Sequence, residues 1–212
     1  MSTGVANRGY FKIEGAAKAF NFDFKDKIVL DIGSSTGGFT KFALDHGAKK
    51  VIAVEKGTNQ MMAPLRYDPR IDLHEKTDIF DIKLGAGDRH GRVPAEHPEG
   101  GAAGGKCLAG PAPDIVVADV SFLSLTKVLK YARMNLARSD TDFLVMLKPQ
   151  FEAKPYQLKN GVVKNETIRR EIIKQFEQWL KNNGYLVVKK HDNELHGKTG
   201  NIERFYYLKL AK

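Results

Sequence analysis

The chain has 212 residues, a length that fits one α/β domain with a full hydrophobic core better than two domains with separate sites. Hydrophobic residues make up 42% and charged residues 28%, and no apolar run approaches the roughly 20 residues of a membrane helix. The N-terminus has no apolar segment behind a basic flank, and Cys107 is the one cysteine. We therefore expect a cytoplasmic protein with no membrane span, secretion signal or disulfide.

The net charge of +9 is unevenly distributed along the chain. Residues 1–147 contain 20 Lys and Arg against 18 Asp and Glu, whereas residues 148–212 contain 14 against 7. A basic region attracts polyanions by releasing their condensed counterions, so nucleic acid is a natural partner. A well-solvated basic surface would explain the same charge, and charge alone leaves both interpretations open.

Four short apolar runs, rich in β-branched residues, predict buried parallel strands. They cover residues 27–31, 50–55, 114–119 and 142–148. Three of these runs end on an acidic residue and the last ends on Lys148. Charged groups therefore gather at the carboxyl ends of the strands, where open α/β sheets bind ligands.

The remaining apolar patterns predict two helices and a hairpin. Helical spacing over 38–47 places a helix between the first two strands, and a longer amphipathic pattern predicts a helix over 166–182. The runs 185–190 and 204–210 are joined by a polar loop too short for a crossover helix, so they predict antiparallel neighbours. A mainly parallel sheet that ends in such a hairpin is the plan of Rossmann-like, class I methyltransferases.

Residues 85–113 have a different composition from the rest of the chain. Of these 29 positions, 12 are Gly or Pro, and no hydrophobic periodicity is present. We predict a flexible surface insertion within a single domain that spans residues 1–212. A lid that closes over substrate is the alternative interpretation.

The glycine-rich turn after the first predicted strand, Asp31-Ile-Gly-Ser-Ser-Thr-Gly-Gly-Phe-Thr40, indicates a cofactor site. Such a turn lets the backbone approach a ligand and points amide N–H groups at it. Its Gly-x-x-x-Gly-Gly spacing lacks the dinucleotide fingerprint, which favours S-adenosylmethionine over NAD. Asp31 can meet the amino group of this cofactor, Glu55 its ribose hydroxyls and Asp78 its adenine amino group.

The complete predicted cofactor set is Asp31, Gly33, Ser34, Gly37, Gly38, Phe39, Glu55 and Asp78. Taken singly, each residue has a structural explanation as a tight turn, a helix cap or an exposed strand end. The cofactor interpretation depends on their order along the strands. No cluster in the sequence predicts a metal site.

Four segments carry a family resemblance: Asn7-Arg-Gly-Tyr-Phe-Lys12, Asp119-Val-Ser-Phe-Leu-Ser-Leu125, Leu147-Lys-Pro-Gln-Phe-Glu152 and Gly200-Asn-Ile-Glu-Arg-Phe205. With them the sequence resembles the TlyA or hemolysin A family, within the FtsJ-like ribose 2′-O-methyltransferases. The resemblance covers nearly the whole chain outside residues 85–113. It implies an active-site tetrad of Lys12, Asp119, Lys148 and Glu203. A structural cluster of ion pairs is the competing interpretation.

The resemblance implies 2′-O-methylation of RNA, with ribosomal RNA or a ribosomal subunit as the expected partner. Lys148 would orient the ribose hydroxyl and accept its proton, with Lys12 nearby disfavouring a second positive charge. Family members usually carry an N-terminal S4-type RNA-binding domain, which we do not recognise in this sequence. RNA capture is therefore expected to depend on the basic C-terminal third, on a missing domain or on a helper protein.

Three other functions stay open from the sequence. The chain could be a non-catalytic RNA-binding protein that keeps an S-adenosylmethionine pocket, or a small-molecule methyltransferase, although the latter gives no reason for the basic C-terminal third. A membrane-active hemolysin is the third, and we find no amphipathic segment for it outside the predicted core helix. The sequence does not predict the oligomeric state or the modified nucleotide.

Overall fold

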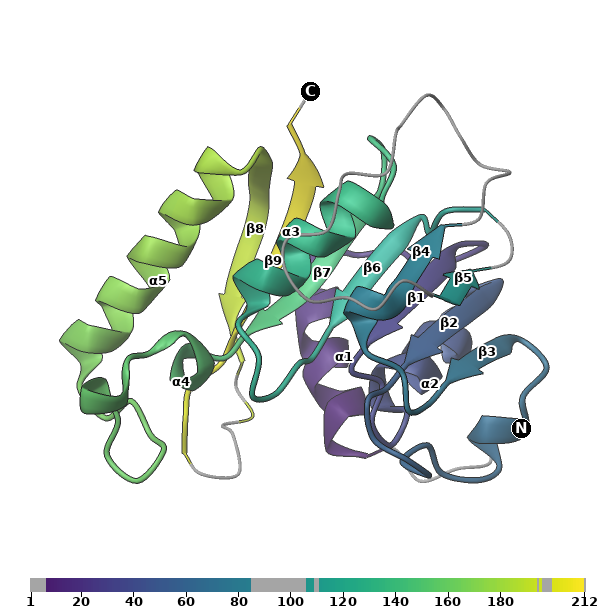
Figure 1. Ribbon diagram of the computed structural model, residues 1–212, viewed down its shortest axis with the longest axis horizontal. Helices are drawn as coiled ribbons and strands as arrows, with labels where there is room; N and C mark the ends of the chain where they lie inside the picture. The colour runs from purple at the N-terminus through teal and green to yellow at the C-terminus, as the bar shows by residue number, and fades with distance from the viewer. Residues whose placement is uncertain (1–6, 85–105, 109–110, 194, 196–199, 212) are drawn as a thin grey trace.

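The apolar runs of the sequence form the strands of one twisted seven-stranded sheet, with the order β3-β2-β1-β6-β7-β9-β8 (Figure 1). A computed structural model describes residues 7–84, 106–108, 111–193, 195 and 200–211. The strands are β1 (Ile28–Ile32), β2 (Lys50–Val54), β3 (Ile71–His74), β6 (Ile115–Ala118), β7 (Asp142–Leu147), β8 (Tyr185–Asp192) and β9 (Arg204–Leu210). The first five are parallel, and β9 is antiparallel to both β7 and β8. The predicted Rossmann-like fold with a C-terminal antiparallel hairpin is confirmed.

Helices cover both faces of this sheet. They are α1 (Arg8–Phe20), α2 (Gly38–Asp45), α3 (Leu125–Asn135), the short α4 (Pro149–Glu152) and α5 (Glu166–Asn182). Helices α3 and α5 pack on one face, and α1 and α2 pack on the other (Figure 1). Alternate residues of β6 point to opposite faces, so Val116 belongs to the first core and Val117 to the second.

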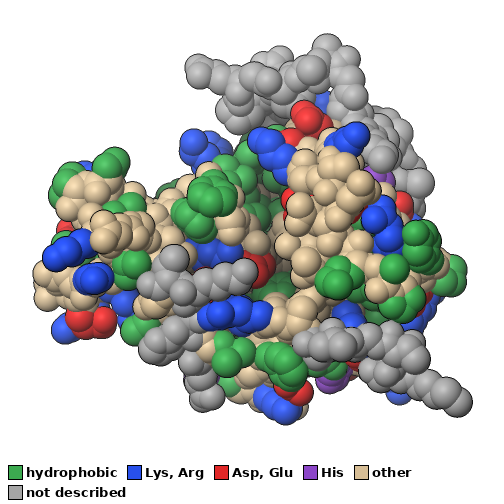
Figure 2. Space-filling model, turned by 90° about the horizontal axis from the view of Figure 1, so that it is seen from below, with side chains coloured by type: hydrophobic (Ala, Val, Ile, Leu, Met, Phe, Trp, Pro, Cys, Tyr) green, Lys and Arg blue, Asp and Glu red, His purple; other side chains and the backbone are tan. Residues whose placement is uncertain are grey.

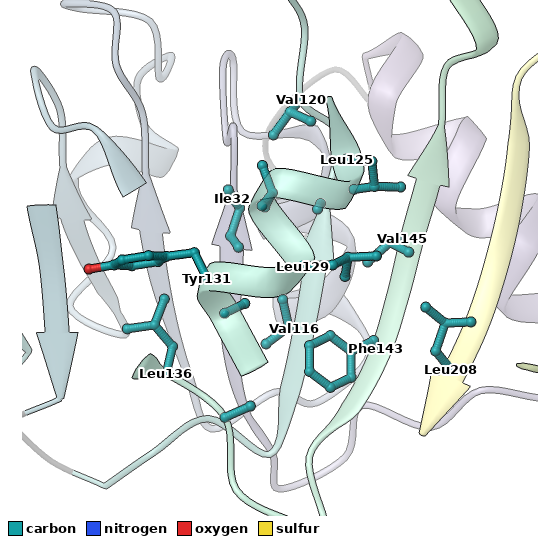
Figure 3. Packing of buried hydrophobic residues seen from close by; sticks show 14 of the residues in the cluster. Ile32, Val116, Val120, Leu125, Leu129, Tyr131, Leu136, Phe143, Val145 and Leu208 are labelled. Atoms are coloured by element: carbon teal, nitrogen blue, oxygen red, sulfur yellow. The ribbon is translucent and has the colours of Figure 1, made fainter. Parts of the chain in front are cut away.

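Helix α3 shows how the first core is packed. Leu129 of α3 lies near Val145 and Phe143 of β7, whereas the ring of Tyr131 points to the other side of the helix, 5.2 Å from the ring of Phe80 (Figure 3). The hydroxyl of Tyr131 is also buried and donates a hydrogen bond to the carbonyl of Ile82 at 2.8 Å. This bond ties the helix to the chain segment at Ile82.

Several elements were not predicted from the sequence, among them α1, α3 and β3. Helix α1 begins at the N-cap Asn7, whose side chain accepts a hydrogen bond from the backbone N–H of Tyr10. The predicted helix over 166–182 is present with those bounds, and the helix expected over 38–47 ends two residues earlier, at Asp45.

Within the range 85–113, for which the sequence predicts a flexible insertion, the structure describes residues 106–108 and 111–113. Strand β5 (Lys106–Leu108) pairs in parallel with β4 (Ile82–Leu84), and Ala112 and Pro113 are buried. Backbone pairing and burial give these residues fixed partners in spite of the Gly and Pro content. Residues 85–105 and 109–110 lie outside the described residues. Among the helices that are described, none is both long and apolar enough to cross a membrane.

Candidate active site

The glycine-rich turn after β1 lies against the loop after β6. Gly33 has φ +80°, and a Cβ there would lie 2.9 Å from the carbonyl oxygen of Asp119, so a larger residue fits neither the conformation nor the space. The backbone N–H groups of Gly33 and Ser34 both donate to the carbonyl of Val54, at 2.9 and 3.1 Å. The turn is therefore held between the ends of β2 and β6 at the carboxyl edge of the sheet.

Asp31 presents an unsatisfied carboxylate oxygen beneath this turn. Its side chain is fully buried, and one oxygen accepts a hydrogen bond from Thr40 Oγ1 at 2.6 Å. Within the part of the chain that is described, the other oxygen and the buried hydroxyl of Ser34 have no hydrogen-bond partner. Burial, together with the charges of Asp119 and Glu55, raises the pKa of Asp31 to about 7, against the hydrogen bonds from Thr40, which lower it. Buried polar atoms normally have partners, so these two fit a polar or cationic ligand group.

Glu55 and Asp78 already have partners at the edge of this site. Glu55 accepts from the backbone N–H of Gly57 at 2.6 Å and from that of Ser35 at 2.9 Å, so it links the turns after β1 and β2. Asp78 accepts from the exposed Lys56 at 2.9 Å and caps the following turn. Each carboxylate oxygen can accept a second bond, so Glu55 keeps capacity for hydroxyl donors.

Gly38 and Phe39 are placed in packing contacts. A Cβ on Gly38 would lie 2.9 Å from the Cα of Gly9 and 2.8 Å from the backbone nitrogen of Tyr10, so this glycine lets α1 pack against α2. The ring of Phe39 is 3% exposed and lies 6.0 Å from the ring of Phe205. The packing of Gly38 and Phe39 therefore positions α1, which carries Lys12. Gly37 is the N-cap of α2 and has φ +89°.

The four residues of the predicted tetrad form two ion pairs at this sheet edge. Lys148 Nζ lies 2.6 Å from an oxygen of Asp119, and Lys12 Nζ lies 2.5 Å from an oxygen of Glu203. The β7–β9 ladder pairs Leu147 with the residue that follows Glu203, so Lys148 and Glu203 come next to each other across the ladder. The structure therefore brings the four together, but each lysine has its own carboxylate.

The two ion pairs differ in exposure. The side chains of Lys12 and Glu203 are 9% and 4% exposed, and those of Lys148 and Asp119 are 11% and 22% exposed. Asn193 reinforces the inner pair, because its backbone N–H donates to the Glu203 carbonyl at 2.8 Å and its side chain lies 3.5 Å from the carboxylate. The pair of Lys148 and Asp119 is the more accessible to a ligand.

Sequence reasoning missed Ser121 and Glu152, two side chains that hold the loops after β6 and β7. Lys148 Nζ donates to the hydroxyl of Ser121 at 2.8 Å. Glu152 accepts from the hydroxyl of Ser124 at 2.7 Å and from the backbone N–H of Leu125 at 2.6 Å, and it thereby caps α3. Burial raises the pKa of Glu152. The signal for both was present, since each residue belongs to a segment that carried the resemblance.

Two aromatic rings lie beside Lys148 on the open side of the site. Phe122 is 94% exposed and has φ +61°, a conformation that a bulky residue rarely adopts. Its ring lies 5.2 Å from that of Phe151, and Lys148 Nζ lies 5.7 Å from the Phe151 ring. Seen from the carboxyl ends of the parallel strands, this face is hollowed, with an acidic side chain inside and basic side chains beside it (Figure 2). A strained, exposed aromatic residue at such a place indicates ligand contact.

No group of three His, Cys, Asp or Glu residues that could bind a metal occurs within the described ranges. The side chains that the structure brings together at this site are lysines, carboxylates and a hydroxyl. This set can orient and deprotonate an alcohol.

Comparisons with known proteins place this architecture in a family. The 16S/23S rRNA (cytidine-2′-O)-methyltransferase TlyA of Mycobacterium tuberculosis is 34% identical over 204 residues, which cover 96% of this chain and 68% of TlyA. The YqxC protein of Bacillus subtilis is 34% identical over 203 residues, which cover 95% of this chain and 64% of YqxC. The chain thus spans about two thirds of the length of these curated relatives.

A solved structure agrees with these sequence matches. It is a protein from Streptococcus thermophilus titled as a hemolysin, and it superposes with a TM-score of 0.80 at 31% identity, over 100% of this chain and 69% of that one. The family model for FtsJ-like methyltransferases matches residues 5–210. The chain therefore belongs to the FtsJ-like methyltransferase family.

Proposed function

We propose that this protein transfers the methyl group of S-adenosylmethionine to a ribose 2′-hydroxyl of RNA, with ribosomal RNA as the first candidate. The observation that carries the proposal is the ion pair of Lys148 and Asp119, which lies directly against the glycine-rich turn through Gly33. A methyl donor on that turn and an alcohol at Lys148 would be neighbours. The names of the relatives support the same reaction, since TlyA is named as an rRNA (cytidine-2′-O)-methyltransferase.

Three side chains would hold the cofactor. Asp31 and Ser34 offer the buried oxygens without partners, and Glu55 offers acceptor capacity at the end of β2. Within the described residues, no lysine pairs with Asp31 or Glu55, so these carboxylates can interact with the positive charge of the cofactor. When bound, S-adenosylmethionine supplies an electrophilic methyl group on a sulfonium centre.

The residues on the acceptor side hold the hydroxyl and receive its proton. Lys148 has three N–H donors, of which one is directed to Asp119 and one to Ser121. The third is available to a substrate oxygen. As the oxygen attacks the methyl group and the bond from that methyl to sulfur breaks, the hydroxyl proton passes to the Asp119 carboxylate, because the ammonium of Lys148 has no lone pair to accept it. The contribution of Lys148 is to orient the hydroxyl for attack.

Basic side chains next to this site favour RNA over a small alcohol as the substrate. Between residues 153 and 165 the chain carries three exposed lysines, Lys154, Lys159 and Lys164, and no acidic residue. The side chain of Asn201 holds this segment, because it accepts from the backbone N–H of Val163 at 3.0 Å and donates to the carbonyl of Gly161 at 3.1 Å. Phosphates bound there would lie on the segment that directly follows α4, whose N-cap is Lys148.

Phe122 supplies a second reason for a nucleic-acid substrate. Its exposed ring, beside Phe151, offers a flat apolar surface at the mouth of the site. Bases stack on such rings with about 1–3 kcal/mol each. A target nucleotide stacked on Phe122 would present its ribose to Lys148. We place this reaction in the cytoplasm, with further affinity for the ribosomal substrate from an additional RNA-binding domain or a helper protein.

The test is methyl transfer from labelled S-adenosylmethionine to unmodified ribosomal RNA and to each ribosomal subunit. We expect label in a 2′-O-methylated nucleoside after digestion of the RNA. A protein that binds the cofactor but transfers no methyl group to any ribosomal RNA or subunit would contradict the proposal. Release of dye from liposomes at low protein concentration would instead support a membrane-active protein.

A further inference from the structure

The surroundings of the Lys148 ammonium show how its direction is determined. Asp119 lies 2.6 Å from Nζ and the hydroxyl of Ser121 lies 2.8 Å from it, while the Phe151 ring lies at 5.7 Å. A lysine ammonium is a point charge on a flexible four-carbon stem, so one ion pair fixes its position but leaves it free to rotate. A second, directional acceptor removes this freedom and determines where the remaining N–H points.

Ser121 is well suited to be that second acceptor. It lies two residues after Asp119, so a single loop carries both partners of Lys148. The next residue, Phe122, has φ +61° and turns the chain directly after the serine. The Phe122 ring packs against Phe151 of α4, the short helix that follows Lys148. Strain of this kind persists only where the surrounding structure enforces it.

The hydroxyl of Ser121 is neutral, and this separates its contribution from that of Asp119. Because the ammonium only donates, the bond uses a lone pair of the serine oxygen and leaves its proton free. A carboxylate in its place would add a further negative charge next to Asp119. The hydroxyl therefore directs Lys148 without changing the charge of the site.

We propose that Ser121 is a positioning residue for methyl transfer, which acts by directing the third N–H of Lys148 at the acceptor hydroxyl. This inference rests on the proposed function. Its consequence is specific, because Ser121 should affect turnover and leave the binding of both substrates unchanged. A misdirected Lys148 loses an interaction that is made only as the reaction proceeds.

The experiment compares Ser121→Ala, Ser121→Thr and the loop control Ser124→Ala in the full chain. We expect Ser121→Ala to lower kcat by about 10- to 100-fold, the worth of one hydrogen bond to a charged group. The dissociation constants for S-adenosylmethionine and RNA should stay within twofold. Ser121→Thr keeps the hydroxyl and should recover most of the turnover, whereas Ser124→Ala, which breaks a bond to Glu152 in the same loop, should lower kcat by no more than a few fold.

A second measurement makes the test independent of activity. The 13Cε signal of Lys148, assigned by its loss in Lys148→Ala, should show greater side-chain mobility in Ser121→Ala than in the wild type. Unchanged mobility, an unchanged kcat, or equal losses in the Ala and Thr variants would each overturn the inference. A wild-type protein without methyl transfer would instead contradict the proposed function, and the mobility would still report on the contact of Ser121 with Lys148.

Discussion

The two halves of the site hold their carboxylates in different ways. On the cofactor side, Glu55 accepts hydrogen bonds from the backbone N–H groups of Ser35 and Gly57. Glu75 accepts three from the backbone of residues 59–61 and also lies 3.3 Å from Arg66. On the acceptor side, the carboxylates of Asp119 and Glu203 are paired with lysines. Backbone bonds fix the shape of a loop, whereas ion pairs keep charged groups in place for chemistry.

This difference suggests a division of labour. A pocket that is shaped by the backbone can bind one cofactor with little reorganisation, and a pair of lysines with their carboxylates can respond to a substrate whose charge changes during the reaction. The two halves meet where Gly33 contacts the Asp119 backbone. Substitutions on the cofactor side should therefore change cofactor binding, and substitutions on the acceptor side should change turnover or RNA binding.

The largest expected effect is that of Lys148→Ala on the acceptor side. Removal of the group that contacts the reacting hydroxyl should lower the rate of methyl transfer by about 10²–10⁴-fold. The affinity for S-adenosylmethionine, measured by calorimetry, should change by less than twofold. Lys181→Ala, at an exposed position near the end of α5, is the matched control and should behave as the wild type. Loss of cofactor binding in Lys148→Ala would show that the two halves are not separate.

Asp31→Asn tests the cofactor side by changing charge at constant shape. Burial raises the pKa of Asp31 to about 7 from an ordinary value of 3.8, so between these pH values the folded protein holds a proton that the unfolded chain has released. The contribution of Asp31 to the stability of the wild type is therefore largest below about pH 4 and is lost as the pH rises toward 7, by on the order of 4 kcal/mol in total. The Asp31→Asn variant should not show this decrease in stability between pH 4 and pH 7.

Urea unfolding of both proteins at pH 5 and pH 8 measures this difference. The asparagine variant should gain stability relative to the wild type as the pH increases, while its affinity for S-adenosylmethionine falls by roughly 10- to 100-fold at pH 8 because a charged acceptor is lost. Equal pH dependence in the two proteins would mean that Asp31 is not the buried proton-binding group.

Local patterns in the sequence predicted most of the sheet and two helices. The strands β1, β2, β6 and β7 are continuous apolar runs, and the face of α5 repeats with the helical period, so a short window is enough to recognise them. Helix α1 was missed because Lys12 occupies its buried face, which breaks the apolar pattern. Its burial depends on Glu203, at a separation of 191 residues.

Local patterns also predicted only part of the candidate active site. The turn at Asp31 and the charged strand ends were recognisable from the sequence, and the resemblance supplied the tetrad, but the contacts of Ser121 and Glu152 join residues 27 and 28 positions apart. Gly38 and Phe39 have residue types suited to a cofactor loop, but Gly38 packs against α1 and Phe39 lies beside Phe205 of β9. Such partners are determined by tertiary packing and leave no local pattern.

Phe122 separates RNA binding from turnover within the acceptor side. Both Phe122→Ala and Phe122→Gly remove the ring and should weaken RNA binding by about 1–3 kcal/mol, or roughly 5- to 150-fold, in a filter-binding assay. Only glycine also relieves the left-handed conformation at φ +61°, so Phe122→Gly should be more stable than Phe122→Ala by about 1 kcal/mol in urea unfolding. RNA binding that is unchanged in both variants would remove the base-stacking role.

The smallest expected effect is that of Glu75→Gln, which reaches the cofactor only through the shape of a loop. Glu75 accepts from the backbone N–H groups of residues 59–61 at 2.7 to 3.2 Å, and these bonds, with Arg66, lower its pKa against the effect of burial. The loop that it holds packs Met61 and Leu65 onto Gly37. Glutamine keeps one acceptor oxygen but turns its amide N–H₂ toward the other donors.

We therefore expect Glu75→Gln to weaken S-adenosylmethionine binding by about three- to tenfold, the worth of one ordinary hydrogen bond, while kcat at saturating cofactor stays near that of the wild type. Calorimetry and steady-state kinetics measure the two quantities, and Glu171→Gln on the exposed face of α5 is the control. A fall in kcat at saturating cofactor would mean that the loop around Met61 also positions the acceptor side. In that case the backbone-held carboxylates would serve catalysis as directly as the paired ones.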